Sequence, residues 1–216
     1  MNLEPTTREG KKAKVREDII NAAVFLFEEQ GYGQTAVDMI AAAAGVSTRT
    51  FFRYFKTKDL VVFPFHSEYV STFIRQLRNG LKSRTPFQTV RHGFRIMAEL
   101  YQQSWKDHLR YQQIISSSPD TLARSVHFDA VWENAVADVW KYERTLSDEQ
   151  IHRANLVAGM IMGAIKVVME KWYASDCRES LTDMGETALD FVEKGIGEDH
   201  LIFDEAVGKP EKRSAS

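Results

Sequence analysis

The sequence predicts an all-α protein with a small N-terminal head of three helices and a larger C-terminal helical body. Apolar residues recur at the three- or four-residue spacing of helices throughout the chain, and no stretch keeps the alternating pattern of a strand. Two short helical patterns with a glycine between them follow the first long one, which is a helix-turn-helix arrangement. We expect residues 12–58 to form the head and residues 59–203 the body, with flexible tails at residues 1–11 and 204–216.

Composition places the 216-residue chain among globular proteins with one large or two small domains. The net charge is −2, but residues 1–60 hold 9 Lys/Arg against 8 Asp/Glu, which leaves 19 against 22 of the total 28 and 30 for the remainder. The head is therefore slightly basic and the body acidic. A single cysteine, Cys177, excludes an internal disulfide and a cysteine-based zinc site. The polar N-terminus and the lack of an apolar run of membrane length predict a cytoplasmic protein without a membrane partner.

The first predicted helix supports the head and ends at Gln30, with Gly31 as its cap. Its apolar stripe comprises Val15, Ile19, Ala22, Ala23, Leu26 and Phe27. Basic side chains at its start form either an arm that approaches phosphate or a solvated tail. These are Lys11, Lys12, Lys14 and Arg16.

Residues 35–60 carry the helix-turn-helix pattern. Thr35 is a suitable N-cap for a helix over residues 37–44, and Gly45 suits the left-handed turn that ends it. Ser47 is a suitable cap for a second helix, whose buried face includes Phe51. An alanine, a glycine four residues later, and apolar residues one and six positions beyond that glycine form the spacing of two closely crossing helices: Ala41, Gly45, Val46 and Phe51.

The outer face of the second helix carries donors and aromatic rings but no carboxylate: Thr48, Arg49, Phe52 and Arg53. The major groove of DNA tolerates such a face, because arginine can read guanine edges and threonine can contact a phosphate or a thymine methyl group. The alternative is a solvated helical hairpin that does not bind nucleic acid.

A fourth helix is predicted from its N-cap Thr57 to a stop near Gly80. Pro64 lies beyond its first turn, where it removes a backbone hydrogen bond, so we expect a kink that is either a fixed bend or a hinge. After a linker at residues 82–86, helical patterns continue through residue 115.

Two further helices begin at recognisable caps. Ser118 is the predicted N-cap of one, with Pro119 at the first helical position, where its missing N–H is harmless. The apolar stripe of this helix comprises Leu122, Val126, Phe128, Val131, Trp132, Ala135, Val136 and Val139. Ser147 and Gln150 form a capping box at the start of the other.

Residues 156–165 are apolar on every face, and a helix without a polar face is buried on all sides. This stretch is too short for a membrane span, so we interpret it as a subunit interface of a homodimer. The last predicted helix, about residues 179–194, completes a four-helix bundle from two chains. The predicted interface residues are Leu156, Gly159, Met160, Gly163, Leu181, Met184, Ala188 and Phe191.

Aromatic and methionine side chains are more abundant between residues 63 and 140 than a tight helical core prefers. Flat and flexible side chains suit adaptable apolar pockets, although each one alone also suits an ordinary core. We expect a small, mostly apolar ligand to be enclosed by Phe73, Phe94, Met97, Tyr101, Tyr111, Phe128 and Trp132.

No pattern of an active site accompanies these helices. The sequence holds no glycine-rich phosphate loop, metal-ligand cluster or nucleophile motif. His92 and His127, like Glu99, Asp129 and Glu133, read either as polar groups around a cavity or as solvated positions on helix faces, and the second reading is favoured. We therefore predict no enzymatic activity, no metal and no cofactor.

The head resembles the signature of the tetracycline-repressor (TetR) family over about residues 14–60. The residues that carry this resemblance are Val46, Ser47, Thr50, Phe51, Phe52, Tyr54, Phe55 and Lys58. It implies a cytoplasmic, homodimeric regulator that binds an inverted-repeat operator in double-stranded DNA and a small-molecule inducer. The predicted DNA-binding residues are Thr35, Ser47, Thr48, Arg49, Thr50, Phe52, Arg53, Tyr54 and Lys58.

Within this set, the resemblance assigns base reading to Thr48 and Arg49. It assigns phosphate contacts to Thr35, Thr50, Tyr54 and Lys58. Phe52 departs from the tyrosine that is usual in the family and so lacks a hydroxyl for phosphate.

Residues 110–124 are similar to a subset that senses long-chain acyl compounds, including the mycofactocin-associated regulators. We expect a repressor that such a ligand releases from DNA. An activator of the same fold and a helical protein-interaction module are the alternatives.

Overall fold

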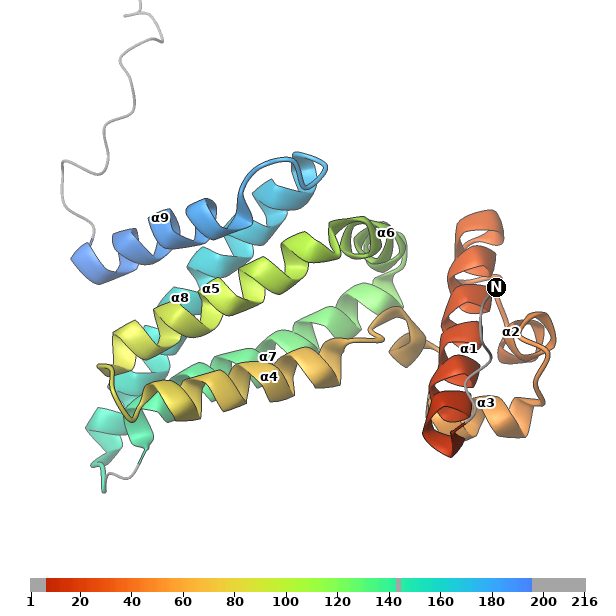
Figure 1. The fold of residues 1–216 in the computed structure, drawn as a ribbon. Helices are drawn as coiled ribbons and strands as arrows, with labels where there is room; N and C mark the ends of the chain where they lie inside the picture. The colour runs from red at the N-terminus through yellow and green to blue at the C-terminus, as the bar shows by residue number, and fades with distance from the viewer. Residues whose placement is uncertain (1–6, 143–144, 196–216) are drawn as a thin grey trace, which may run out of the picture.

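A computed structural model describes residues 7–142 and 145–195, and this part of the chain is all-α, as predicted (Figure 1). In Figure 1, α1 to α3 form the head at one end of the molecule, and the longer helices of the body lie at the other. The elements are α1 (Arg8–Gln30), α2 (Val37–Ala43), α3 (Thr48–Tyr54), the 3-10 helix η1 (Asp59–Val62), α4 (His66–Gly80), α5 (Pro86–Gln103), α6 (Trp105–Ser116), α7 (Pro119–Lys141), α8 (Asp148–Ala174) and α9 (Leu181–Lys194).

Helix α1 starts earlier than the sequence pattern suggested. The Thr7 side chain accepts a hydrogen bond from the Gly10 amide and caps the helix, so residues 8–11 are helical rather than part of a flexible tail. The predicted end at Gln30 is confirmed. The other residues predicted to form tails, 1–6 and 204–216, lie outside the described part of the chain.

The helix-turn-helix is formed as predicted. Gly45 has φ of +66°, a left-handed conformation that costs glycine little, and it turns the chain between α2 and α3. The Ser47 hydroxyl accepts a hydrogen bond from the Thr50 amide at 3.1 Å and caps α3. Phe51 is fully buried and anchors α3 to the other head helices.

The prediction of one continuous, kinked helix through Pro64 is wrong. The chain forms the short helix η1, breaks at residues 63–65, and begins α4 only at His66. Proline disfavours the helical conformation in the residue before it, so the chain breaks here instead of bending. Thr57 does not cap a long helix; instead its side chain bonds to Asp59.

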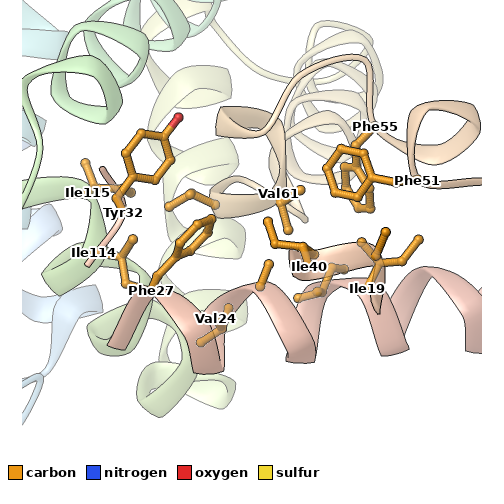
Figure 2. Packing of buried hydrophobic residues seen from close by; sticks show 14 residues of the cluster. Ile19, Val24, Phe27, Tyr32, Ile40, Phe51, Phe55, Val61, Ile114 and Ile115 are labelled. Carbon is orange, nitrogen blue, oxygen red and sulfur yellow. The ribbon is translucent and has the colours of Figure 1, made fainter. Parts of the chain in front are cut away.

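The head core includes two side chains from the body. Ile114 and Ile115, in the last turn of α6, are 4% and 9% exposed and pack with Phe27 and Tyr32 of the head (Figure 2). Burying an isoleucine contributes about 1.5–3 kcal/mol. The buried cluster of the head therefore extends beyond residue 58 to η1 and to the last turn of α6.

Ion pairs reinforce this contact between head and body. The Arg110 guanidinium on α6 donates two hydrogen bonds to Glu28 on α1, and Arg124 on α7 pairs with Asp59 on η1. Burial opposes ionisation of Asp59, but hydrogen bonds from Thr57 and Arg124 outweigh it and lower the pKa of this carboxyl group.

Helices α7 and α8 begin at the predicted caps, whereas α5 begins at a cap, Thr85, that lies within the predicted linker at residues 82–86. Thr85 and Gln88 form a capping box on α5, as Ser147 and Gln150 do on α8. Ser118 is the N-cap residue of α7, although its side chain makes no capping hydrogen bond. The predicted stripe of α7 holds only in its second half, because Leu122 and Val126 are 51% and 64% exposed.

Arg91 ties α5 to α9. Its guanidinium pairs with Glu186, Asp190 and Glu193 at 2.7–2.8 Å. A shallow groove of about 280 Å³ beside it is lined by Arg84, Gln88, Arg91, His92, Arg95 and Glu186. This groove is polar and holds none of the predicted ligand-binding residues.

Candidate functional site

The exposed face of α3 carries the side chains that the sequence singled out. Thr48, Arg49, Phe52 and Arg53 are exposed, and Ser47 is exposed at the N-terminus of the helix. Phe52 is 50% exposed, and its ring packs edge-on against that of Phe51, with 5.4 Å between the ring centroids. The exposed half of the Phe52 ring lies beside Thr48, Arg49 and Arg53 and so adds an apolar element to this polar surface.

The remaining α3 positions lie closer to the head core. Thr50 and Tyr54 are half-buried, and the Thr50 hydroxyl lies 3.0 Å from that of Ser47. The Arg53 guanidinium lies over the Tyr54 ring, 5.3 Å from its centroid. Among the described residues, neither Arg49 nor Arg53 forms an ion pair, so both charges are available to an anion.

The structure contradicts the phosphate contact predicted for Thr35. Its side chain is 1% exposed, and its hydroxyl donates to the Gly31 carbonyl at 2.9 Å. Thr35 is not the N-cap of α2 either, because Ala36 holds that position without a side-chain bond. Thr35 therefore fixes the turn between α1 and α2.

Lys58 also bonds within the head. Its ammonium group donates to the carbonyls of Tyr32 at 2.7 Å and Thr35 at 2.9 Å, and it lies 3.9 Å from the centroid of the Tyr32 ring. Burial lowers the pKa of this amine. Lys58 thus holds α3 and η1 to the turn after α1, a role that sequence spacing alone did not indicate.

Four of the seven predicted ligand-binding residues lie together in the body: Phe73, Phe94, Met97 and Trp132. The Phe73 ring is fully buried, with centroids of Phe94 and Trp132 both 4.9 Å from its own. A Cβ atom added to Gly93 would lie 2.9 Å from Phe73. The rings therefore fill the predicted pocket, because they pack on one another and on the backbone of α5.

The other three predicted residues are spread toward the head. The Phe128 ring packs against Phe63 and stacks on His66, with centroids 4.8 and 3.8 Å away. Tyr111 on α6 contacts Phe65, 6.1 Å between ring centroids. Both positions lie at the junction of head and body rather than in the apolar cluster.

Tyr101 belongs to a polar cluster that sequence reasoning missed. Its ring stacks on His108 with centroids 3.9 Å apart and an angle of 8°. The Tyr69 hydroxyl lies 3.2 Å from His108 Nε2 and 3.3 Å from Ser104 Oγ. Burial lowers the pKa of His108 to about 4, so the imidazole is neutral at physiological pH. The sequence signal for this cluster was the four-residue spacing of Ser104 and His108. This spacing places the N-cap residue of α6 and a residue in its first turns on the same face.

The predicted dimer residues divide into two groups. Leu156, Met160 and Phe191 are 53%, 54% and 44% exposed, and a Cβ atom added to Gly163 would meet nothing within 4 Å. These positions form an uncovered surface of α8 and α9.

The remaining four residues face their own chain. Leu181 is 4% exposed and packs beside Ala98 and Trp172, so its predicted interface role is wrong. Met184 and Ala188 are partly buried against the same cluster. A Cβ atom on Gly159 would lie 3.6 Å from the Glu133 carboxylate.

Comparison with known proteins gives two family models that match this architecture. The model described as bacterial regulatory proteins of the tetR family matches residues 19–62, and that of the MftR C-terminal domain matches residues 84–197. The HTH-type transcriptional regulator TcmR of Streptomyces glaucescens is 27% identical over 86% of both chains. The fatty acid metabolism regulator protein of Bacillus subtilis is 36% identical over 66 residues, 31% of this chain and 34% of that one.

Solved structures share the fold. Thermus thermophilus FadR, a TetR-family repressor solved with lauroyl-CoA, aligns with a TM-score of 0.58 and 26% identity over 84% of this chain and 94% of that one. TetR-family proteins are cytoplasmic transcriptional regulators rather than enzymes; they bind DNA and small molecules and act as dimers. The MftR C-terminal model alone spans more than half of the 216 residues of this chain, and the tetR model matches the head. The chain therefore belongs to the TetR family, with a C-terminal domain of the MftR type.

Proposed function

We propose that the protein is a transcriptional repressor whose dimer binds an inverted-repeat operator and releases it when a mostly apolar ligand enters the body. The observation that carries this proposal is the exposed face of α3. It offers Thr48, Arg49, Phe52 and Arg53 without a carboxylate, on a head whose core is completed by α6 of the body.

On DNA, Arg49 and Thr48 would read base edges, because they stand at the exposed start of α3. N-terminal residues of a recognition helix reach deepest into the major groove. Arg53, Tyr54 and the hydroxyls of Ser47 and Thr50 would contact the phosphate backbone. The exposed ring of Phe52 suits an apolar contact such as a thymine methyl group.

The ligand would enter where the rings of α4, α5 and α7 pack, around Phe73, Phe94 and Trp132. Aromatic rings and Met97 can rearrange around a guest at modest cost, because their contacts are adaptable. Support for a long-chain acyl ligand comes from the lauroyl-CoA that T. thermophilus FadR, 26% identical, holds, and from the resemblance noted for residues 110–124.

Dimer formation would cover the exposed apolar residues of α8 and α9. A two-fold dimer presents two identical recognition helices, about 34–36 Å apart or a multiple of that spacing, which accounts for an inverted repeat.

A gel shift on the DNA flanking its own gene tests this function, with lauroyl-CoA as the first probe. The wild type should shift this DNA but not random DNA, and the probe should release it. A protein-interaction module would shift neither DNA. In a reporter strain, loss of the protein should raise expression from the same DNA; a fall would identify an activator.

A further inference from the structure

The interior face of α4 carries three successive layers of rings between the head and the far end of the body. His66, Tyr69 and Phe73 stand at helical spacing, so their side chains point to one side of the helix. His66 stacks on Phe128, and Tyr69 packs with Tyr101 and His108. The rings of the third layer, Phe73, Phe94 and Trp132, pack within an apolar cluster. The rings along α4 thus change from polar near the head to apolar around Phe73, although the buried hydroxyl of Thr89 lies beyond them, beside Gly80.

The polar layers are only loosely satisfied. The Tyr69 hydroxyl can donate to one of its two partners and accept from the other, but both contacts are long: 3.2 Å to His108 Nε2, against a usual 2.9–3.0 Å between nitrogen and oxygen, and 3.3 Å to Ser104 Oγ, against 2.7–2.8 Å between two oxygens. One turn nearer the head, His66 Nε2 is buried and has no hydrogen-bond partner among residues 7–142 and 145–195. Buried polar atoms of this kind cost free energy until they find a partner. A guest that offers a donor or acceptor here would supply the bond that His66 Nε2 lacks and could replace the long contacts of Tyr69 with shorter ones.

The charged side chains that act on Tyr69 and Tyr101 are carboxylates at exposed positions. The carboxylates of Glu68 and Asp107 raise the pKa of Tyr69, after the larger effect of burial, and Asp129 does the same for Tyr101. His108 is neutral and so does not offset them. A buried carboxylate on a ligand would meet repulsion and a large desolvation cost, whereas a neutral hydroxyl, amide, ester or thioester would not.

We infer that the ligand is an amphiphile that binds in one direction, with an uncharged hydrogen-bonding group at Tyr69, Ser104 and His108 and its apolar tail against Phe73, Phe94 and Trp132. This inference rests on the proposed function and adds the orientation and the chemical class of the ligand. It also links the ligand to the head. Ser104 and His108 belong to the start of α6, and the last turn of the same helix lies in the head core.

Two probes of equal chain length test the inference on the full-length dimer: decan-1-ol, which forms hydrogen bonds, and 1-chlorodecane, which barely does. Affinities for both are measured by calorimetry on the wild type and on Tyr69→Phe. The substitution should weaken decan-1-ol binding about threefold to tenfold, the range for one hydrogen bond, and leave 1-chlorodecane within about twofold. His108→Phe, which keeps a ring to stack on Tyr101, should do the same. Decanoate should bind more weakly than decan-1-ol at neutral pH.

Two control variants separate packing from hydrogen bonding. Tyr142→Phe makes the same chemical change at an exposed position and should alter neither affinity. Phe94→Leu, in the apolar layer, should weaken both probes by a similar factor. Operator binding without ligand confirms that each variant is folded.

The outcomes distinguish this inference from the proposed function. If both probes release the operator but Tyr69→Phe and His108→Phe weaken them equally, or not at all, the polar subsite is refuted and the proposed function stands. If decanoate binds as well as decan-1-ol, the ligand class is wrong. If neither probe binds the wild type, the inference fails, whereas the proposed function is decided separately by release of the operator with lauroyl-CoA.

Discussion

Arg49 and Lys58 carry the same charge in the head, but the chain uses the two charges differently. Arg49 is exposed and makes no ion pair among the described residues, whereas the Lys58 ammonium group donates to two carbonyls. A charged group that is hydrogen-bonded within the fold stabilises the head and is not available to DNA. Only charges such as those of Arg49, Arg53 and exposed Lys56 remain for DNA.

Arg49→Ala should therefore reduce sequence discrimination, with a loss of about 1–3 kcal/mol on the operator if Arg49 makes a bidentate base contact. Binding to random DNA should change little. Lys56→Ala is the matched control: it should weaken both DNAs alike and reduce the slope of log affinity against log salt by about one. Equal losses on both DNAs for Arg49→Ala would remove this residue from base reading.

Lys58→Met should destabilise the head rather than change its salt dependence. Methionine keeps most of the length of the side chain but leaves the carbonyls of Tyr32 and Thr35 without their charged donor, at a cost of about 1.5–3 kcal/mol. Urea denaturation followed by circular dichroism measures this loss. An unchanged midpoint, together with a flatter salt slope on DNA, would return Lys58 to the phosphate-contacting set.

His108 makes stability depend on pH. Burial lowers its pKa from 6.5 to about 4, so between these values the unfolded chain binds a proton that the folded chain does not. Stability is therefore lost as pH falls from about 6.5 toward 4. This residue accounts for a loss of about 2 kcal/mol between pH 7 and pH 5.

Urea denaturation of the wild type and of His108→Phe at both pH values measures this contribution. The variant should show the smaller loss on acidification, and equal losses would show that His108 is protonated in the fold.

At the scale of elements, the ends of helices are predictable from sequence where they depend on residues three or four positions apart. The predicted caps at Ser47 and Ser147 have such local partners, and the structure confirms their hydrogen bonds. The chain around Pro64 is different. Its apolar spacing also fits a continuous helix, and the break is favoured by contacts from distant elements, such as the Arg16 guanidinium that donates to the Pro64 carbonyl.

Helix α6 is the element that joins body and head, and Ile114→Ala tests this role. Removing a side chain that is 4% exposed in the head core should cost about 2–5 kcal/mol. Amide hydrogen exchange should accelerate in both α1 and α6, because each supports the other. Ile96→Ala, a partly buried change in the body core, should leave exchange in α1 unaltered. Protection of α1 that survives Ile114→Ala would show that the head is stable without α6.

At the scale of the whole molecule, the sequence shows which residues are apolar, but it does not show whether their own chain or a second chain covers them. Leu181 and Leu156 both lie on helices assigned to the interface, yet one is buried by its own chain and the other is exposed. The same limit applies to the ligand-binding region. Composition indicated its aromatic character, whereas the polar cluster around Tyr69 and His108 depends on how α4, α5 and α6 cross.

Helix α8 shows how an apolar surface can be read in two ways. By length and composition it could cross a membrane: its most apolar 18-residue stretch has a mean hydropathy of 1.3. Only 22% of that stretch is buried within the chain. A core helix of a soluble protein can have the same composition. Its exposed residues Leu156 and Met160 recur at one-turn spacing, as expected for a stripe that a second helix covers.

Gly163→Leu is the sharpest test of the dimer. A Cβ atom at this position meets no described atom of its own chain within 4 Å, and leucine is a better helix former than glycine, so the single chain should fold at least as well. The added bulk would, however, hold off a partner helix that packs against α8. Sedimentation at micromolar concentration should show a dimer for the wild type, a dimer for the small change Gly163→Ala, and a monomer for Gly163→Leu. Operator binding should fall with the dimer, because a lone head contacts one half-site only. A Gly163→Leu protein that still sediments as a dimer would place the interface on another face.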